Sequence, residues 1–256
     1  MTPFGLEGRK GLVVGIANDQ SIAWGCARAF RAAGADLAVT WLNEKARPWV
    51  EPLATQLQAP IAMALDVEQD EQLDALFKTI GERWGKLDFV LHSIAFAPRS
   101  ELHGRVVDTT RGGFARAMDI SCHSFARMAC LAEPLMKDGG SLLTMSYVGA
   151  EEVIPNYGVM GPVKAALEGS MRYLAAELGP QGIRVNAVSP GPLATRAASG
   201  IANFDQLMQD ATARAPLRRL VDVDDVGAMC VFLASDAGRS VTGTTLYVDA
   251  GFHILG

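Results

Sequence analysis

Cysteine, long apolar runs and excess positive charge are all scarce in this sequence of 256 residues, and each shortage excludes a class of protein. The four cysteines form no Cys-x-x-Cys pair and none stands at metal-ligand spacing from a histidine. We therefore expect no metal site and reduced thiols in or near the core, which is typical of a cytoplasmic protein. No run approaches 18 apolar residues and residues 1–10 lack a signal peptide's apolar stretch, so we expect no membrane span.

The charge balance and composition describe a globular protein without a polyanionic partner. A net charge of −5 argues against general affinity for nucleic acid or an anionic membrane. Arg214, Arg218 and Arg219 could form a local basic patch or only the solvated end of a helix. With 49% hydrophobic residues, no Pro/Gly/Ser-rich linker, no charge block and no internal repeat, residues 1–256 are expected to form a single domain.

Short apolar runs alternate along the chain with longer helical patterns. The runs predict strands at residues 11–15, 36–41, 61–65, 87–92, 141–146, 184–189 and 244–248. The longer patterns predict helices at residues 22–33, 46–57, 71–84, 109–136 and 160–178. The strand runs are almost continuously apolar, as in parallel strands buried on both faces. The expected fold is an α/β, doubly wound Rossmann fold whose seven-stranded parallel sheet has helices on both faces.

A loop that could hold a dinucleotide pyrophosphate follows the first predicted strand. Residues 15–25, GIANDQSIAWG, lead from that strand into a helix, where backbone N–H groups and the helix N-terminus can face a phosphate. The sequence lacks the usual G-x-G-x-x-G, because Ala17 and Ser21 replace two glycines. We expect Ser21 to cap the helix and contact phosphate. The alternative is an ordinary strand–helix loop with a serine cap.

The ends of the second and third predicted strands bear on cofactor choice. Residues 41–45, WLNEK, place no Arg at the strand tip to pair with a 2′-phosphate, which favours NADH over NADPH. Leu42 would then lie near the adenosine ribose. Asp66 could accept a hydrogen bond from the adenine amino group, with Val67 beside it, or could only cap the next turn.

The fourth predicted strand ends in residues 92–98, HSIAFAP, which would pass beside the nicotinamide. Ser93 and Ile94 are small enough to line that site. His92 lies inside the strand, so we expect a buried imidazole with satisfied hydrogen bonds rather than a base. Phe96 could face the substrate or fill the core.

Tyr157 and Lys164 are the most informative pair in the chain. Seven residues correspond to about two helical turns, which would bring the two side chains within about 20° of one helix face. A phenol can donate a hydrogen bond to an oxygen that becomes negative, and an ammonium beside it can hold a cofactor sugar. The spacing alone also fits a core Tyr and a surface Lys. Because Pro162 is tolerated only in a first helical turn, we expect the regular helix to begin near Gly161.

Two further strand ends meet the same edge of the predicted sheet. Ser146 and Tyr147 end the fifth strand, and residues 186–192, NAVSPGP, end the sixth. The backbone from Pro192 to Thr195 could bind the nicotinamide carboxamide, with Thr195 near phosphate. Small residues with a glycine and an amphipathic segment at 204–208 then predict a mobile lid at about residues 194–213 over an apolar substrate, or else an ordinary surface loop and helix.

With these motifs in view, the chain resembles the short-chain dehydrogenase/reductase superfamily. It looks most like the bacterial NADH-dependent enoyl-acyl-carrier-protein reductases of type II fatty-acid synthesis. The resemblance runs nearly end to end, and its most specific parts are residues 21–25, 92–98, 146–157 and 191–201. Six residues separate Tyr157 from Lys164, whereas ordinary superfamily members have three between their Tyr and Lys.

The resemblance implies a reaction and a set of roles. Hydride would pass from NADH to C3 of a trans-2-enoyl thioester carried by acyl carrier protein, and the enzyme would be a homotetramer. Tyr157 would hydrogen-bond the thioester carbonyl as it becomes an enolate, Lys164 would bind the nicotinamide ribose, and Tyr147 would line the pocket. The implied substrate residues are Phe96, Ala97, Leu102, Tyr147, Tyr157, Met160, Ala197, Ile201 and Phe204. The implied cofactor residues are Gly15, Ser21, Ile22, Leu42, Asp66, Val67, Ser93, Ile94, Ala95, Lys164, Pro192, Leu193 and Thr195.

Two other functions remain open from the sequence. One is a reductase on the same scaffold that acts on a ketone or a different enoyl thioester. A carbonyl-reducing member should show Tyr-x-x-x-Lys with a partner Ser, so the observed spacing disfavours it. The other is a nucleotide-binding protein without turnover, against which the intact set of Tyr147, Tyr157 and Lys164 argues.

Overall fold

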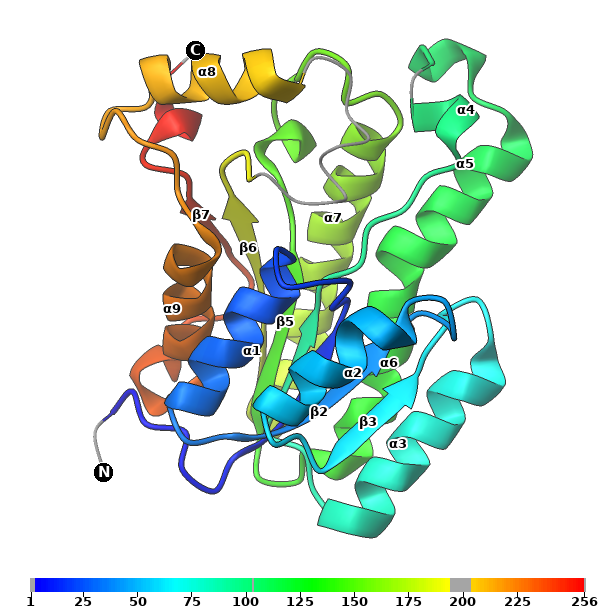
Figure 1. Cartoon of the computed structure of the whole chain (residues 1–256), viewed down its shortest axis with the longest axis vertical. Coiled ribbons are helices and arrows are strands. Elements are labelled where there is room, and N and C mark those ends of the chain that lie inside the picture. Colours follow the sequence, from blue (N-terminus) through cyan, green and yellow to red (C-terminus); the bar gives the residue numbers. More distant parts are fainter. Residues whose placement is uncertain (1–2, 103, 194–203, 256) are drawn as a thin grey trace.

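Seven parallel strands form one sheet in the order β3-β2-β1-β4-β5-β6-β7 (Figure 1). The computed structural model describes residues 3–102, 104–193 and 204–255. The strands are β1 Lys10–Val14, β2 Asp36–Trp41, β3 Ile61–Ala64, β4 Phe89–His92, β5 Gly140–Met145, β6 Ile183–Pro190 and β7 Thr245–Val248. The reversal of strand order between β1 and β4 marks a doubly wound sheet, which confirms the predicted fold class.

Helices cover both faces of this sheet (Figure 1). One apolar core is built with α1 Ile22–Ala32, α2 Arg47–Gln56 and α9 Val223–Ala234. The other is built with α3 Asp70–Trp84, α6 Ser124–Ala132 and α7 Met160–Leu178. Beyond the carboxyl ends of the strands stand α4 Arg99–Leu102 and α8 Phe204–Arg214, with α5 Arg111–Met118 leading toward them.

Successive strand residues point into alternate cores, which is why the strand runs are continuously apolar. In β1, Leu12 belongs to the α3/α6/α7 core and Val13 to the α1/α2/α9 core. In β4, Val90 and Leu91 divide in the same way, and all four side chains are fully buried. Each strand therefore stabilises both layers through removal of apolar surface from water.

The structure differs from the predicted helices in four places. The single helix expected at residues 109–136 is divided into α5, a π-helical segment Asp119–His123, α6 and a 3₁₀ turn Glu133–Leu135. Helices α4 and α9 were not predicted, and α8 extends beyond the expected 204–208. The start of α9 is fixed by a capping box, in which the Asp222 carboxylate accepts from the Asp225 N–H and Asp225 accepts from the Asp222 N–H.

The cysteines follow the prediction except at one position. Cys26 in α1 and Cys230 in α9 are fully buried with their Sγ atoms 3.7 Å apart, and Cys122 is buried too. Cys130 is exposed, so its expected place in or near the core is wrong. It lies on α6, a helix that buries only the face turned to the sheet. Throughout the described part of the chain, every helix is too short or too polar to span a lipid bilayer.

Candidate functional site

The loops that follow β1 and β4 touch at the carboxyl edge of the sheet. Gly15 has φ +110°, and a Cβ built on it would lie 2.1 Å from the carbonyl oxygen of Ser93. Only glycine fits this position, because a side chain would be both strained and in collision with backbone. The sequence predicted Gly15 and Ser93 as cofactor residues, and the fold brings their backbones together at its switch point.

The predicted side-chain cap of α1 is wrong. Ser21 stands at the N-cap position in extended conformation, but its hydroxyl makes no capping bond to the helix. It donates to the Asn18 carbonyl at 2.7 Å and accepts from the Ala17 N–H at 3.4 Å, so it closes the preceding loop instead. With no side-chain cap hydrogen bond at Ser21, this helix start retains the backbone donors and the dipole that attract an anion.

At the adenosine end of the predicted cofactor site, Leu42 is 55% exposed directly after β2. Asp66 is half-buried after β3, and its Oδ1 accepts from the Glu68 N–H at 3.0 Å. That bond supports the alternative in which Asp66 caps a turn, and its adenine contact stays a prediction. Val67 is buried, and its carbonyl accepts from Arg127.

His92 is a fully buried imidazole whose two ring nitrogens both have partners, as the sequence predicted. Nδ1 lies 3.0 Å from Thr144 Oγ1 and Nε2 lies 2.8 Å from Ser124 Oγ. Burial, with the positive charge of Lys164 as a smaller cause, lowers the pKa of His92 to about 3. The ring is therefore neutral at physiological pH and serves as a structural link between β4, β5 and α6.

Acid should destabilise the protein through His92. The folded state keeps the ring neutral down to a pKa of about 3, whereas an unfolded chain binds the proton near its ordinary pKa of 6.5. The free energy of unfolding should therefore fall between those values, by at most about 1.4 kcal/mol per pH unit. Urea denaturation across this range measures it. In His92→Gln, whose amide can bond the same hydroxyls without titrating, the slope should be smaller; an equal slope would contradict the assignment.

Phe96 does not fill the core, so that alternative is wrong. Its ring is 38% exposed with the Arg116 guanidinium 4.9 Å from the ring centroid. Its backbone is fixed by Ser121, whose Oγ accepts from the Phe96 N–H and donates to the Phe96 carbonyl, each at 2.8 Å. Ser121 belongs to the π-helical segment and was not predicted. Such a π-bulge is a frequent feature of functional sites, but helical periodicity does not reveal it.

Tyr157 lies before α7 rather than on it, so the helix-face argument for its pairing with Lys164 is wrong. The regular helix begins at Met160, next to the expected Gly161. The preceding turn uses positive φ at Asn156 (+63°) and Gly158 (+52°) to bring the chain round. Tyr157 is 8% exposed and packs edge-on against Tyr147, with ring centroids 4.9 Å apart.

Lys164 is anchored at the carboxyl end of β5, just before Tyr147. Its side chain is 4% exposed, and Nζ donates to the carbonyl oxygen of Met145 at 2.7 Å. Tyr147 follows two residues later and contacts Tyr157. Tyr147 and Tyr157 are thus in ring contact just beyond the carboxyl end of β5, and Lys164 is bonded to the last residue of that strand.

Burial sets the protonation of this group. It raises the pKa of Tyr147 to about 12 and raises that of Tyr157 well above its ordinary value, so both phenols keep their protons. Burial lowers the pKa of Lys164 to about 8, so the ammonium still predominates at neutral pH. The Tyr147 hydroxyl is buried without a hydrogen-bond partner among the described residues, and a ligand oxygen would satisfy it.

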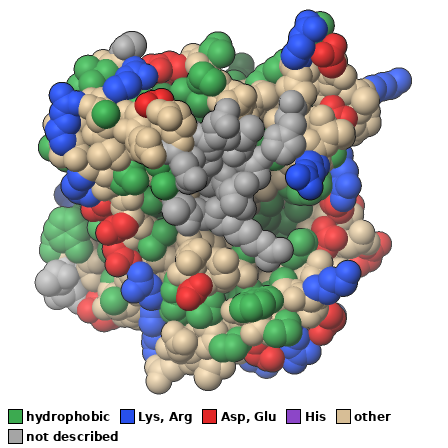
Figure 2. Space-filling model, turned by 45° about the horizontal axis from the view of Figure 1, so that its top comes forward, with side chains coloured by type: hydrophobic (Ala, Val, Ile, Leu, Met, Phe, Trp, Pro, Cys, Tyr) green, Lys and Arg blue, Asp and Glu red, His purple; other side chains and the backbone are tan. Residues whose placement is uncertain are grey.

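Apolar side chains beside Tyr157 form the wall of the site. Met160 is buried in the same core cluster as Tyr157, and Ile94, Ala97 and Leu102 pack against that cluster. Ala95 is exposed beside them, Ile22 is half-buried, and Pro192 and Leu193 are buried directly after β6. Thr195, Ala197 and Ile201 lie outside the described residues, as does the side chain of Phe204. Figure 2 turns the carboxyl edge of the sheet toward the viewer, and hydrophobic side chains line a hollow in the surface there.

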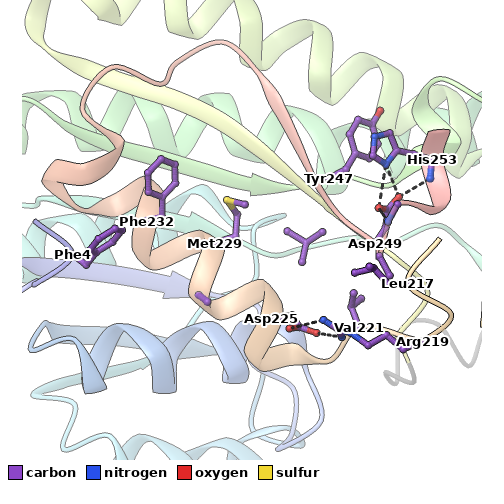
Figure 3. Close-up of a pocket in the computed structure, with 14 residues that line it drawn as sticks. Phe4, Leu217, Arg219, Val221, Asp225, Met229, Phe232, Tyr247, Asp249 and His253 are labelled. Carbon is purple, nitrogen blue, oxygen red and sulfur yellow. Dashed lines mark hydrogen bonds and ion pairs between the residues drawn. The ribbon is translucent and has the colours of Figure 1, made fainter. Parts of the chain in front are cut away.

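A separate pocket lies between α9 and β7 (Figure 3). It has a volume of about 560 Å³ and contains none of the predicted site residues. His253 Nδ1 lies 2.9 Å from Asp249 Oδ2. The His253 ring stacks on the Tyr247 ring with their centroids 3.8 Å apart. Within the described ranges, no cluster of three or more His, Cys, Asp or Glu side chains is arranged to hold a metal ion.

Known proteins resemble this chain over nearly its whole length. The family model described as enoyl-(acyl carrier protein) reductase matches residues 15–253. The NADH-dependent enoyl-acyl-carrier-protein reductase 1 of Rhizobium meliloti is 49% identical over 251 residues, covering 98% of this chain and 92% of that protein. The NADH-dependent enoyl-acyl-carrier-protein reductase FabI of Nostoc sp. is 46% identical over 258 residues, covering 98% of both.

Solved structures give the same result. The crystal structure of the enoyl-acyl-carrier-protein reductase of Anaplasma phagocytophilum in complex with NAD matches with a TM-score of 0.94 and 50% identity, covering 98% of this chain and 96% of that one. The NADH-dependent reductase of Aquifex aeolicus matches with a TM-score of 0.94 and 44% identity, covering 98% of this chain and 99% of that one. Since the family model spans nearly the whole chain and the relatives are close to half identical along it, this chain belongs to the enoyl-acyl-carrier-protein reductase family.

Proposed function

We propose that this protein reduces a trans-2-enoyl thioester of acyl carrier protein with NADH, and that Tyr157 and Lys164 carry the reaction. The single observation that carries these roles is the buried Lys164 ammonium, anchored on the Met145 carbonyl beside the Tyr147–Tyr157 pair. A buried cation and two protonated phenols at the carboxyl edge of a doubly wound sheet suit a nucleotide and a carbonyl oxygen.

The residues present fit a dinucleotide. The close approach at Gly15 and the α1 start that the Ser21 side chain leaves uncapped would hold the pyrophosphate. Lys164 has three N–H donors and one described acceptor, the Met145 carbonyl, so donors remain for the ribose hydroxyls. Leu42, exposed directly after β2, offers no charge to a 2′-phosphate, which favours NADH. The Arg47 guanidinium near this strand end lies 5.6 Å from the Trp41 ring centroid and is paired with Glu51. When bound, NADH supplies the hydride that C3 of the enoyl group receives.

The protein's part in the chemistry is electrostatic. Hydride addition at C3 drives negative charge onto the thioester oxygen, and it is fast only where a donor is already in place. A proton delivered to C2 would then convert the enolate into the saturated thioester. Tyr157, which burial keeps protonated, would donate to that oxygen. The Tyr147 hydroxyl, which has no described partner, would be a second hydrogen-bond donor to the same oxygen. The positive charge of Lys164 would stabilise the negative charge that develops there. Met160 and Leu102 would pack the acyl chain.

A ketone reductase is the weaker alternative. That chemistry would need a Ser hydroxyl free to assist the Tyr, but Ser146, which precedes Tyr147, donates its hydroxyl to Glu168. The direct test follows NADH absorbance with crotonyl or longer 2-enoyl thioesters and with a 3-ketoacyl thioester. Oxidation with enoyl substrates alone is expected; oxidation with the ketoacyl substrate alone would overturn the proposal.

Lys164→Met should weaken NADH binding about 10- to 100-fold, because hydrogen bonds from a charged group are worth about 1.5–3 kcal/mol. Met keeps most of the packing volume of the buried stem and removes the donors. Fluorescence titration with NADH measures the effect. Lys78→Met, at an exposed position of α3, should leave the affinity unchanged. Equal affinity in Lys164→Met and the native protein would exclude the ribose contact.

The assembly, the lid and the compartment belong to the same proposal. We infer a homotetramer in the cytoplasm, as the resemblance implies, and a lid at about residues 194–213 that covers the substrate. The four free thiols are compatible with a reducing compartment. Light scattering coupled to size-exclusion chromatography tests the assembly, and a mass of one or two chains would contradict it.

A further inference from the structure

Glu168 is a buried carboxylate that the proposed reaction does not use. It is 3% exposed and lies on α7 one helical turn after Lys164, on the same face. Nothing in the sequence motifs singled it out. A carboxylate is seldom buried without a partner, since loss of hydration costs several kcal/mol. Its position next to the proposed cofactor-binding cation therefore calls for a physical role.

Its hydrogen-bond partner is Ser146, whose Oγ donates to Glu168 Oε1 in a short bond. Ser146 lies between Met145, whose carbonyl accepts from Lys164, and Tyr147. Two bonds from consecutive residues thus join the end of β5 to α7, one to each member of the Lys164/Glu168 pair. Neither the lysine nor the strand end can shift without disturbing the other.

The charges around Lys164 show what the carboxylate adds. Burial lowers the pKa of Lys164 to about 8, while Cys122 and Glu168 oppose that effect. Cys122 lies in the π-helical segment, and His92 of β4 faces the same cation but is neutral. Tyr247 of β7 has a pKa raised by burial and then by Glu151, and the charge of Glu168 is a smaller cause. Glu168 is the only carboxylate among the described groups that influence Lys164 in this way.

We propose that Glu168 is a positioning residue: through Ser146 it holds the strand end whose Met145 carbonyl anchors Lys164, and its negative charge favours the ammonium that the cofactor needs. The inference rests on the proposed role of Lys164. It divides the work between two groups: the Met145 carbonyl sets where Nζ lies, and the negative charge of Glu168 favours the protonated form of a side chain that is only 4% exposed. Tyr157 then acts beside a cation whose charge holds up to mildly alkaline pH.

Glu168→Gln separates charge from shape. The amide oxygen can still accept from Ser146, but the negative charge is gone. We expect the alkaline limit of NADH binding, set in the native protein by the Lys164 pKa of about 8, to move down by about one pH unit. The NADH dissociation constant should rise about fivefold at pH 8, approach a tenfold rise at higher pH, and change less than about twofold at pH values two units lower. Titrations across this range, with thermal unfolding recorded for each sample, measure the shift.

Two further variants complete the experiment. Ser146→Ala removes the bond but not the charge, so it should raise the NADH dissociation constant severalfold at every pH without moving the alkaline limit. Glu177→Gln, at an exposed position of the same helix, should match the native protein throughout. If Glu168→Gln does not fold, Ser146→Ala carries the test, and an unchanged affinity in that variant would overturn the proposal.

Failure of this inference is distinguishable from failure of the proposed function. An unchanged pH profile in Glu168→Gln, or a loss that is equal at all pH values and accompanied by early unfolding, would leave Glu168 a purely structural residue. If Lys164→Met binds NADH weakly in the same titrations, the role of Lys164 survives and only the positioning role falls. If Lys164→Met binds NADH normally, both fall together.

Discussion

Replacing Tyr157 by Phe should lower kcat for enoyl thioester reduction about 100- to 1,000-fold, the usual cost of removing one preorganised donor to an oxyanion. The ring would keep its edge-on contact with Tyr147 and its place in the core, so only the hydroxyl is lost. The dissociation constant of NADH should stay within about twofold, because we assign the ribose contact to Lys164 and not to Tyr157. Steady-state kinetics with crotonyl thioester and a separate NADH titration measure the two quantities.

Tyr173→Phe provides the matched control. Tyr173 is 75% exposed on α7, so the loss of its hydroxyl should change neither quantity. A Tyr157→Phe enzyme with native kcat would show that the thioester oxygen finds its donor elsewhere, and the orphaned Tyr147 hydroxyl would be the first candidate. A loss of NADH affinity equal to the loss of rate would instead indicate a general collapse of the site.

Gly15→Ala should lower the free energy of unfolding by about 3–5 kcal/mol and abolish measurable NADH binding. The new Cβ would lie 2.1 Å from the Ser93 carbonyl oxygen, and the residue would keep a φ of +110°. Backbone strain of about 1–3 kcal/mol and overpacking of similar size then add, since neither loop end can move without disturbing the sheet. Urea denaturation and the NADH titration measure both effects.

Gly85→Ala isolates the strain from the collision. Gly85 ends α3 with φ +68°, and a Cβ built there meets nothing within 4 Å. This variant should lose only about 1–2 kcal/mol and keep NADH affinity. Equal losses in the two variants would mean that the contact between the β1 and β4 loops relaxes freely, and the argument for Gly15 as part of a rigid cradle would fail.

The fold could be predicted where burial alone decides the pattern. β2 at 36–41 and α7 at 160–178 agree residue for residue with their predictions, since one is buried on both faces and the other carries a long periodic core face. The π-helical segment could not be predicted, because one additional residue in a turn leaves the overall apolar spacing almost unchanged. α9 was missed because Met229 to Ala234 is almost continuously apolar and lacks a visible polar face.

Some residues of the candidate site could also be predicted from the sequence, and others could not. Residues in the loops after strands, such as Gly15 and Ser93, follow from the order of strands in a doubly wound sheet. The bonds from Ser121 to the Phe96 backbone, and from Ser146 to Glu168, could not be predicted, because they join elements whose relative register is set by packing. Two sequence patterns around Tyr157 are incompatible, its helical spacing from Lys164 and the nearby Pro162, and the structure agrees with the proline.

The hydrogen bond that anchors Lys164 does not depend on the identity of the residue that accepts it. Nζ donates to a main-chain oxygen of Met145, and every amino acid supplies that atom. Exchange of the side chain at position 145 therefore leaves the acceptor in place, so long as β5 keeps its register with β4 and β6. Substitutions that repack this part of the α1/α2/α9 core therefore leave Lys164 with its hydrogen-bond acceptor.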